Sequence, residues 1–178
     1  MAAKRAPRDS GAAPPWTQQP LDLFCDRLPT RPYCSDSPST EGLYRLPLAD
    51  ALHRLLIQPN TAKRVVCLCF DVDREQAAID WNDRNCPAPN LTVKNPANGH
   101  AHLIYLLSAP VAVSDVARIK PVIFMAAIQE GLRRALEADR GYAGVVVKNP
   151  AHKHWITKAW RDQAYSLEEL ADLVELLF

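Results

Sequence analysis

Arg64-Val-Val-Cys-Leu-Cys-Phe-Asp71-Val-Asp73 is the stretch of sequence that decides the fold. Its continuous apolar run predicts a buried central strand, because a strand that is covered on both faces has no polar face to alternate. Alternate residues of a strand share a face, so the two carboxylates should lie on one side, about 7 Å apart along the backbone. Such a pair can hold divalent metal ions, although a solvated strand end or a helix cap is the commoner role of a single pair.

Predicted strands and helices flank this run. Residues 90–95 and 101–107 enclose the turn sequence Asn95-Pro-Ala-Asn-Gly99 and predict a hairpin, and residues 144–147 predict a short strand. Apolar residues at helical spacing predict helices over residues 21–28, 47–57, 114–138 and from Ser166 onward. Ser114 or Asp115 would cap the third helix and Pro121 would kink or restart it. Ser166 and Glu169 form a capping box that opens the fourth.

Composition bounds the class of protein. The 178 residues suit one domain, and no apolar run approaches the roughly 20 residues that cross a bilayer. We expect a flexible arm over residues 1–20, where four prolines lie, followed by a catalytic domain over 21–178. Five cysteines without a CxxC pair indicate reduced thiols, and the absence of a secretory signal indicates the cytoplasm. The net charge of +1 gives no bulk-charge argument for nucleic-acid binding.

Two histidines and a third acid add to the candidate site. His100-Ala-His102 enters the second strand of the predicted hairpin, so both imidazoles should face one side. They could donate to triphosphate oxygens, or be half-buried histidines satisfied by the backbone. Asp139 follows the long predicted helix and precedes a glycine turn. It either completes a metal cluster with the first two aspartates or ends a helix in a loop.

A short internal echo places two lysines beside histidines. Val93-Lys-Asn-Pro-Ala97 recurs as Val147-Lys-Asn-Pro-Ala151, and an HxH follows each copy. If the identity is not chance, two similar loops present a lysine and a histidine to one site. Lys94 and Lys148 are therefore candidates for contacts with phosphate, with solvent exposure as the alternative.

A basic and aromatic stretch suits single-stranded nucleic acid. Aromatic rings stack on bases and cations contact the backbone, although aromatic residues more often pack in a core. The candidate DNA-binding residues are Tyr142, His154, Trp155 and Lys158.

The order of these motifs resembles the archaeo-eukaryotic primase superfamily, and within it the replicase family of plasmid Rep replication initiators. Phe70-Asp71-Val-Asp73 is similar to the first motif of the superfamily, a hydrophobic strand that ends in DxD or DxE. His100-Ala-His102-Leu-Ile-Tyr105 is similar to the second, and Asp139 to the single acid of the third. Tyr142 and Lys148-Asn-Pro150 resemble the residues that follow this acid in the replicase family.

The resemblance implies both a fold and an activity. The fold would be α+β, with a mixed β-sheet in two halves, flanking helices and the active site between the halves. Asp71, Asp73 and Asp139 would hold Mg²⁺ or Mn²⁺, and His102 would contact the phosphates of the incoming nucleotide. A histidine stands at position 100, where the motif has a small residue, so the choice between His100 and His102 for this contact stays open.

The expected activity is template-directed nucleotidyl transfer from an NTP or dNTP. Expected partners are single-stranded or origin DNA and host replication proteins, without a membrane. The family's C-terminal helical and origin-binding parts have no counterpart in the sequence.

Three other functions compete with a polymerase. An HUH-type nicking Rep or relaxase would use His100 and His102 as metal ligands, but it needs a nucleophilic tyrosine on a helix, and Tyr142 lies in a glycine turn. An origin-binding module without catalysis needs a helix-turn-helix or a basic surface, and neither is evident. A DxD sugar transferase would have little room for an acceptor domain.

Overall fold

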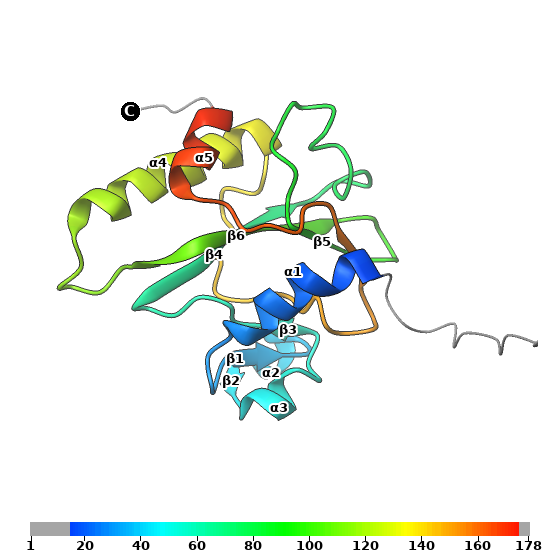
Figure 1. The fold of residues 1–178 in the computed structure, drawn as a ribbon. Coiled ribbons are helices and arrows are strands. Elements are labelled where there is room, and N and C mark those ends of the chain that lie inside the picture. Colours follow the sequence, from blue (N-terminus) through cyan, green and yellow to red (C-terminus); the bar gives the residue numbers. More distant parts are fainter. Residues whose placement is uncertain (1–14, 175–178) are drawn as a thin grey trace, which may run out of the picture.

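The computed structural model describes residues 15–174, which form two four-stranded sheets with helices around them (Figure 1). The larger sheet has the order β4-β6-β5-β8, and the smaller has the order β2-β1-β3-β7. All named strand pairs are antiparallel, so two halves are confirmed but the expected mixed pairing is not. The larger sheet consists of β4 (Arg64–Val72), β5 (Leu91–Lys94), β6 (Ala101–Ala112) and β8 (Ile156–Ala159). The smaller consists of β1 (Tyr33–Ser35), β2 (Tyr44–Arg45), β3 (Leu56–Ile57) and β7 (Val147–Lys148).

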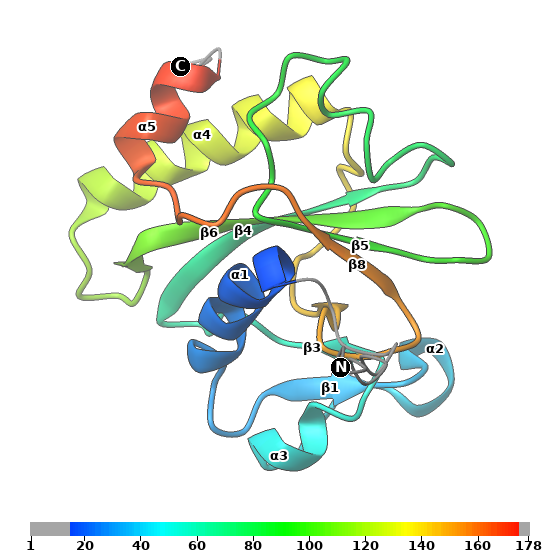
Figure 2. The ribbon, with the colours of Figure 1, turned by 45° about the vertical axis from the view of Figure 1, so that its right-hand side comes forward.

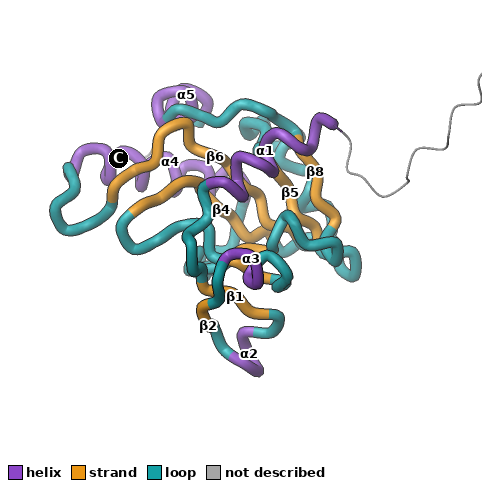
Figure 3. The backbone as a smooth tube through the Cα atoms, turned by 60° about the horizontal axis from the view of Figure 1, so that its bottom comes forward, coloured by secondary structure: helices purple, strands orange, loops and turns teal. Residues whose placement is uncertain are grey.

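The helices cover opposite faces of the larger sheet. Helices α4 (Ile119–Leu136) and α5 (Leu167–Leu173) lie over one face, while α1 (Pro15–Asp26) crosses the other, between the two sheets (Figures 2 and 3). Two single-turn helices, α2 (Pro38–Glu41) and α3 (Leu48–Ala51), accompany the smaller sheet. Within residues 15–174 no helix combines the length and the apolar character that a membrane span requires.

Strand alternation divides the core into two clusters. Leu68 and Phe70 of β4 pack toward α4 and α5, whereas Cys67 and Cys69 pack toward α1 and the smaller sheet. β6 alternates in the same way, with Leu103 on the first side and Ile104 on the second. Because side chains alternate with period two, Asp71 and His102 are on the side of the smaller sheet.

The predicted strands at 64–71, 90–95 and 101–107 are confirmed, the strand predicted over 144–147 is wrong except at Val147, and several helix predictions need correction. β4 and the β5–β6 hairpin form where expected, β6 continues to Ala112, and β7 lies at Val147–Lys148. Helix α1 begins at Pro15, so the last residues of the expected arm are helical, while residues 1–14 lie outside the described part. Helix α4 begins at Ile119 with Arg118 as its N-cap, so Ser114 and Asp115 do not cap it. Pro121 lies in its first turn, where a missing N–H costs no helical hydrogen bond.

The helix predicted over residues 47–57 is wrong beyond its first turn. Side chains from other segments bind the backbone groups that a longer helix would use: Asp36 accepts from the amide of Leu55. Asn149 donates to the carbonyls of Leu52 and Arg54, each at 2.9 Å. Ile57 instead pairs with Cys34 and Val147 in the smaller sheet. Tertiary contacts therefore override the local helical pattern here.

The predicted N-cap of α5 is present. Ser166 Oγ accepts from the amide of Glu169 at 3.0 Å. The carboxylate of Glu169, however, accepts from Arg161 at 2.7 Å, so the second half of the capping box is replaced by an ion pair. Leu170 is buried, and Leu167, Ala171 and Val174 pack against the core, as the pattern predicts; Leu177 lies outside the described residues.

Candidate active site

Three aspartates from distant parts of the sequence converge at one end of β4. One carboxylate oxygen from each of Asp71, Asp73 and Asp139 lies within 4.8 Å of those of the other two. The third acid reaches this point because its amide donates to the Asp71 carbonyl at 2.8 Å, directly after α4 ends. Gly141 then donates its amide to Asp139 Oδ1 at 2.8 Å, which orients the carboxylate.

His102 faces Asp71 across the β4–β6 pairing, because these two residues are register partners. His102 Nδ1 accepts the amide of Lys148 at 2.9 Å, which joins the two sheets at the site. An accepting Nδ1 leaves the proton of the neutral ring on Nε2, which lies 3.3 Å from Asp71 Oδ1. The Tyr142 ring packs beside the imidazole at a centroid distance of 5.1 Å, and His102 is only 5% exposed.

Burial and charge together set the ionisation of this group of residues. Burial would raise the pKa of Asp71, but contact with His102 and the charge of Lys148 outweigh it, so the pKa lies below its ordinary value. Burial lowers the pKa of His102 and that of Lys148, and the neighbouring Asp71 opposes both changes in part. The expected state near neutral pH is an ionised Asp71 beside a neutral imidazole.

His100 is the more accessible histidine. Its Nδ1 lies 3.0 Å from Asp73 Oδ1, and its side chain is 35% exposed. The residue before it, Gly99, has φ +80° and brings the hairpin turn against the segment after the DxD motif. A Cβ at this position would lie 2.2 Å from the Glu75 carbonyl oxygen. The close backbone approach fixes where the first histidine stands relative to Asp73.

The residues present fit a divalent metal of the magnesium type. Asp71 Oδ1 is buried, with Lys148 Nζ at 3.7 Å, yet it makes no hydrogen bond of normal geometry. His102 Nε2 and Lys148 Nζ approach this oxygen without hydrogen-bond geometry, so the buried carboxylate can still accept positive charge from an ion. Three carboxylates are the hard oxygen ligands that Mg²⁺ and Mn²⁺ prefer.

Comparison with known proteins now supports an assignment of the chain. The Replicase family model matches residues 27–174. The chain belongs to the Replicase family. Among solved structures, it resembles the AEP domain (PP-N190) of the cyanophage S-2L primase-polymerase (PrimPol), with a TM-score of 0.59 and 13% sequence identity. The match covers 87% of this chain and 94% of that domain, and at this identity it shows a shared fold. No relative was found among curated proteins.

The family match confirms the predicted relationship to the Replicase family, and the structural match confirms the predicted fold of a primase-polymerase domain.

Of the two lysines in the echoed segments, Lys148 lies in the site of this Replicase family domain. Lys94 lines a polar hollow of about 440 Å³ formed by residues 94–100 with Glu75 and Gln76. His100 lines the same hollow and also contacts Asp73, so the hollow opens beside the acids. The two copies do form similar turns, since Asn95 and Asn149 each accept the amide two residues later.

Two of the four candidate DNA-binding residues, Tyr142 and Trp155, are partly packed, and the other two are exposed. Tyr142 is mostly buried and donates its hydroxyl to the Val146 carbonyl at 2.7 Å, and burial raises its pKa. Such a phenol is a poor nucleophile, which weakens the nicking alternative. Trp155 donates its indole N–H to the Leu55 carbonyl at 2.8 Å. His154 and Lys158 are exposed, and the Lys158 ammonium lies 4.0 Å from the ring centre of Trp160.

Sequence reasoning missed two residues of the Replicase family site. Asn149 is fully buried and secures the loop that carries Lys148, and Arg74 contacts the segment before Asp139. A signal for Asn149 was available, because it belongs to the echoed segment. Arg74 follows the DxD motif directly, but no local pattern shows which distant carbonyls its side chain reaches.

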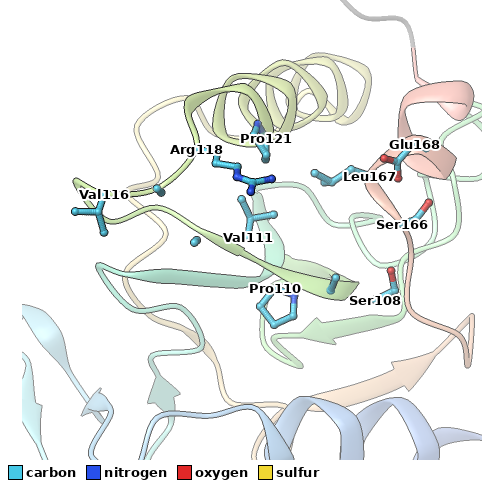
Figure 4. Close-up of a pocket in the computed structure, with 12 residues that line it drawn as sticks. Ser108, Pro110, Val111, Val116, Arg118, Pro121, Ser166, Leu167 and Glu168 are labelled. Atoms are coloured by element: carbon cyan, nitrogen blue, oxygen red, sulfur yellow. The ribbon is translucent and has the colours of Figure 1, made fainter.

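A second cavity is remote from the acids. It has a volume of about 520 Å³ and lies between the far end of β6, the first turn of α4 and the start of α5 (Figure 4). Val111 and Leu167 contribute apolar surface, and Arg118 extends between them. The acids lie at the other end of β6, beside His102, so this cavity takes no part in the site.

Proposed function

We propose that this domain is the catalytic part of a plasmid replication initiator that makes primers by template-directed nucleotidyl transfer. The observation that carries the proposal is the convergence of three carboxylates beside a histidine pair and a lysine. Ordinary structural acids are spread apart by their mutual repulsion, so a cluster this tight favours a cation-binding role. Membership of the Replicase family supports the same function.

Asp71, Asp73 and Asp139 would hold the ions. Bound Mg²⁺ or Mn²⁺ would favour the ionised 3′-hydroxyl and neutralise charge on the leaving pyrophosphate. In the reaction, the 3′-oxygen of the primer forms a bond to the α-phosphorus of an NTP or dNTP. The bond from that phosphorus to the β-phosphate bridging oxygen breaks, and the hydroxyl proton passes to solvent.

The protein's own residues position the nucleotide. We assign the triphosphate to the polar hollow at the β5–β6 turn, where Lys94 and the accessible His100 can donate to its oxygens. His102 is buried and contacts Asp71, so we assign it the orientation of that carboxylate, while Lys148 offsets the charge beside it. The template DNA would run past the exposed His154 and Lys158.

A primer-synthesis assay tests the proposal. The protein is incubated with single-stranded DNA, labelled NTPs or dNTPs, and Mn²⁺ or Mg²⁺, and the products are resolved by size. Asp71→Ala should lower the rate by about 1,000-fold or more, because it removes several kcal/mol of stabilisation of the transition state by the metal ions. Asp115→Ala is the matched control, because Asp115 is exposed on the loop before α4. Equal product from wild type and Asp71→Ala, or a nicked template joined to a tyrosine, would overturn the assignment.

A further inference from the structure

We propose that Arg74 is a positioning residue that sets the metal affinity of the site by holding Asp139 in place. The inference rests on the proposed function, because it assumes that the three acids bind metal. Arg74 follows the DxD motif directly, and its guanidinium reaches the C-terminal end of α4. It thus joins the first acidic motif to the segment that delivers the third acid.

Two contacts of Arg74 are with backbone oxygens that the helix leaves unpaired. Nη2 donates to the Leu136 carbonyl at 2.7 Å, and Nη1 donates to the Glu137 carbonyl at 3.3 Å. Leu136 is the last residue of α4, and Glu137 is its C-cap in a left-handed conformation with φ +48°. The last carbonyls of a helix have no partner within the helix, so a side-chain donor fixes the path of the chain there.

The remaining backbone groups up to Asp139 are held as well. Arg133 donates to the Ala138 carbonyl at 3.3 Å, and the Asp139 amide donates to Asp71. Each peptide group between the end of α4 and the third acid therefore has a partner outside the helix ladder. Arg74 supplies two of these contacts from a position adjacent to Asp73.

Arg74 is itself oriented by an acid. Its Nε donates to Asp80 Oδ2 at 2.6 Å, and the Asp80 side chain is 15% exposed. Charge adds a second effect, because the C-terminus of a helix carries partial negative charge and α4 ends beside three carboxylates. The Arg74 guanidinium at the helix end offsets that partial negative charge.

Arg84 offers a matched comparison within the same network. It contacts Asp80 at 3.3 Å and the Glu137 carboxylate at 2.9 Å, but these are side-chain contacts only. Its side chain is 28% exposed, against 27% for Arg74. Removing Arg84 deletes the same charge without releasing a carbonyl of the α4 terminus.

The test is Mn²⁺ binding to the free protein, measured by titration calorimetry or by the loss of the free-ion EPR signal. Outer-shell partners of metal ligands are typically worth about 10–100-fold in affinity, so Arg74→Met should raise the Mn²⁺ Kd by that factor. Arg74→Lys should recover part of the affinity, because an ammonium can donate to one of the carbonyls. Arg84→Met should leave the Mn²⁺ Kd within about threefold of wild type, because Arg84 contacts side-chain carboxylates and no carbonyl of the α4 terminus.

Other outcomes separate the failure of this inference from failure of the proposed function. If Arg74→Met binds Mn²⁺ as wild type does, or if Arg84→Met weakens binding equally, the positioning role is refuted. If wild type and Asp71→Ala bind Mn²⁺ alike, the metal site itself is refuted. Circular dichroism reports folding. Should Arg74→Met unfold, the double variant Arg74→Met/Asp80→Asn removes the carboxylate charge that would be left with Arg84 as its one cationic partner among the described residues, and its Mn²⁺ Kd gives the same test.

Discussion

Replacing Asn149 with alanine should destabilise the protein and displace Lys148. Asn149 is fully buried, and its side-chain amide donates to the Leu52 and Arg54 carbonyls. Its Oδ1 accepts from the Ala151 amide at 3.1 Å. The substitution removes all three hydrogen bonds and leaves the two carbonyls without this donor.

The size of the effect follows from these three bonds. At about 0.5–1.5 kcal/mol for each net hydrogen bond, the loss in free energy of unfolding is about 1.5–4.5 kcal/mol. Urea unfolding followed by tryptophan fluorescence measures it. With a urea m-value of about 2 kcal/mol/M, the midpoint should fall by about 1–2 M. If the free energy of unfolding decreases by less than about 0.5 kcal/mol, the three hydrogen bonds contribute little to stability and the reasoning is refuted.

Asn90 is the control for this experiment. It is equally buried, donates to the Arg161 and Gln163 carbonyls, and accepts from the Leu106 amide at 2.7 Å. Asn90→Ala should therefore lose similar stability. It does not hold the loop of Lys148, so under native conditions it should retain more primer synthesis than Asn149→Ala does.

Two further predictions concern titration and capping. Burial lowers the pKa of His102 in the folded state. As the pH decreases through about 6.5, the ordinary histidine pKa, the unfolded chain takes up the proton first, so the free energy of unfolding decreases as the pH is lowered. Between pH 7.5 and 5.5, the Tm should fall less for His102→Gln than for wild type. His53 is exposed, so for His53→Gln the Tm should fall as it does for wild type. Equal falls in Tm for His102→Gln and wild type would contradict this prediction. Ser166→Ala should remove the cap of α5 and lower the free energy of unfolding by about 1 kcal/mol, which corresponds to about 2–4 °C in Tm. Ser37→Ala should lower the Tm by less, because the Ser37 side chain makes no cap hydrogen bond at α2.

The sequence was most informative where local pattern and tertiary environment agree. The apolar run that ends at Asp71 predicts a buried strand, and β4 is buried on both faces by two core clusters. Period-two alternation also places Asp73 with Asp71, and His100 with His102, on one side of the sheet. These residues could be predicted because a single strand and a single hairpin position them.

Long-range side-chain contacts explain what the sequence did not reveal. The pattern of residues 47–57 is helical, but Asp36 and Asn149 bind its backbone groups from other segments. Tyr142 and Trp155 suggest base stacking, yet each donates its polar hydrogen to a nearby carbonyl and packs against the core. The role of Arg74 depends on where α4 ends in space, which no local spacing encodes.

The turn at Gly99 restricts which residues evolution can place there. The Glu75 carbonyl oxygen occupies the space that any Cβ would need, and the positive φ disfavours every residue with a side chain. A substitution would push the hairpin away from the neighbouring segment and carry its first histidine with it. Functional descendants of this protein should therefore conserve glycine at position 99 even while the surrounding turn diverges.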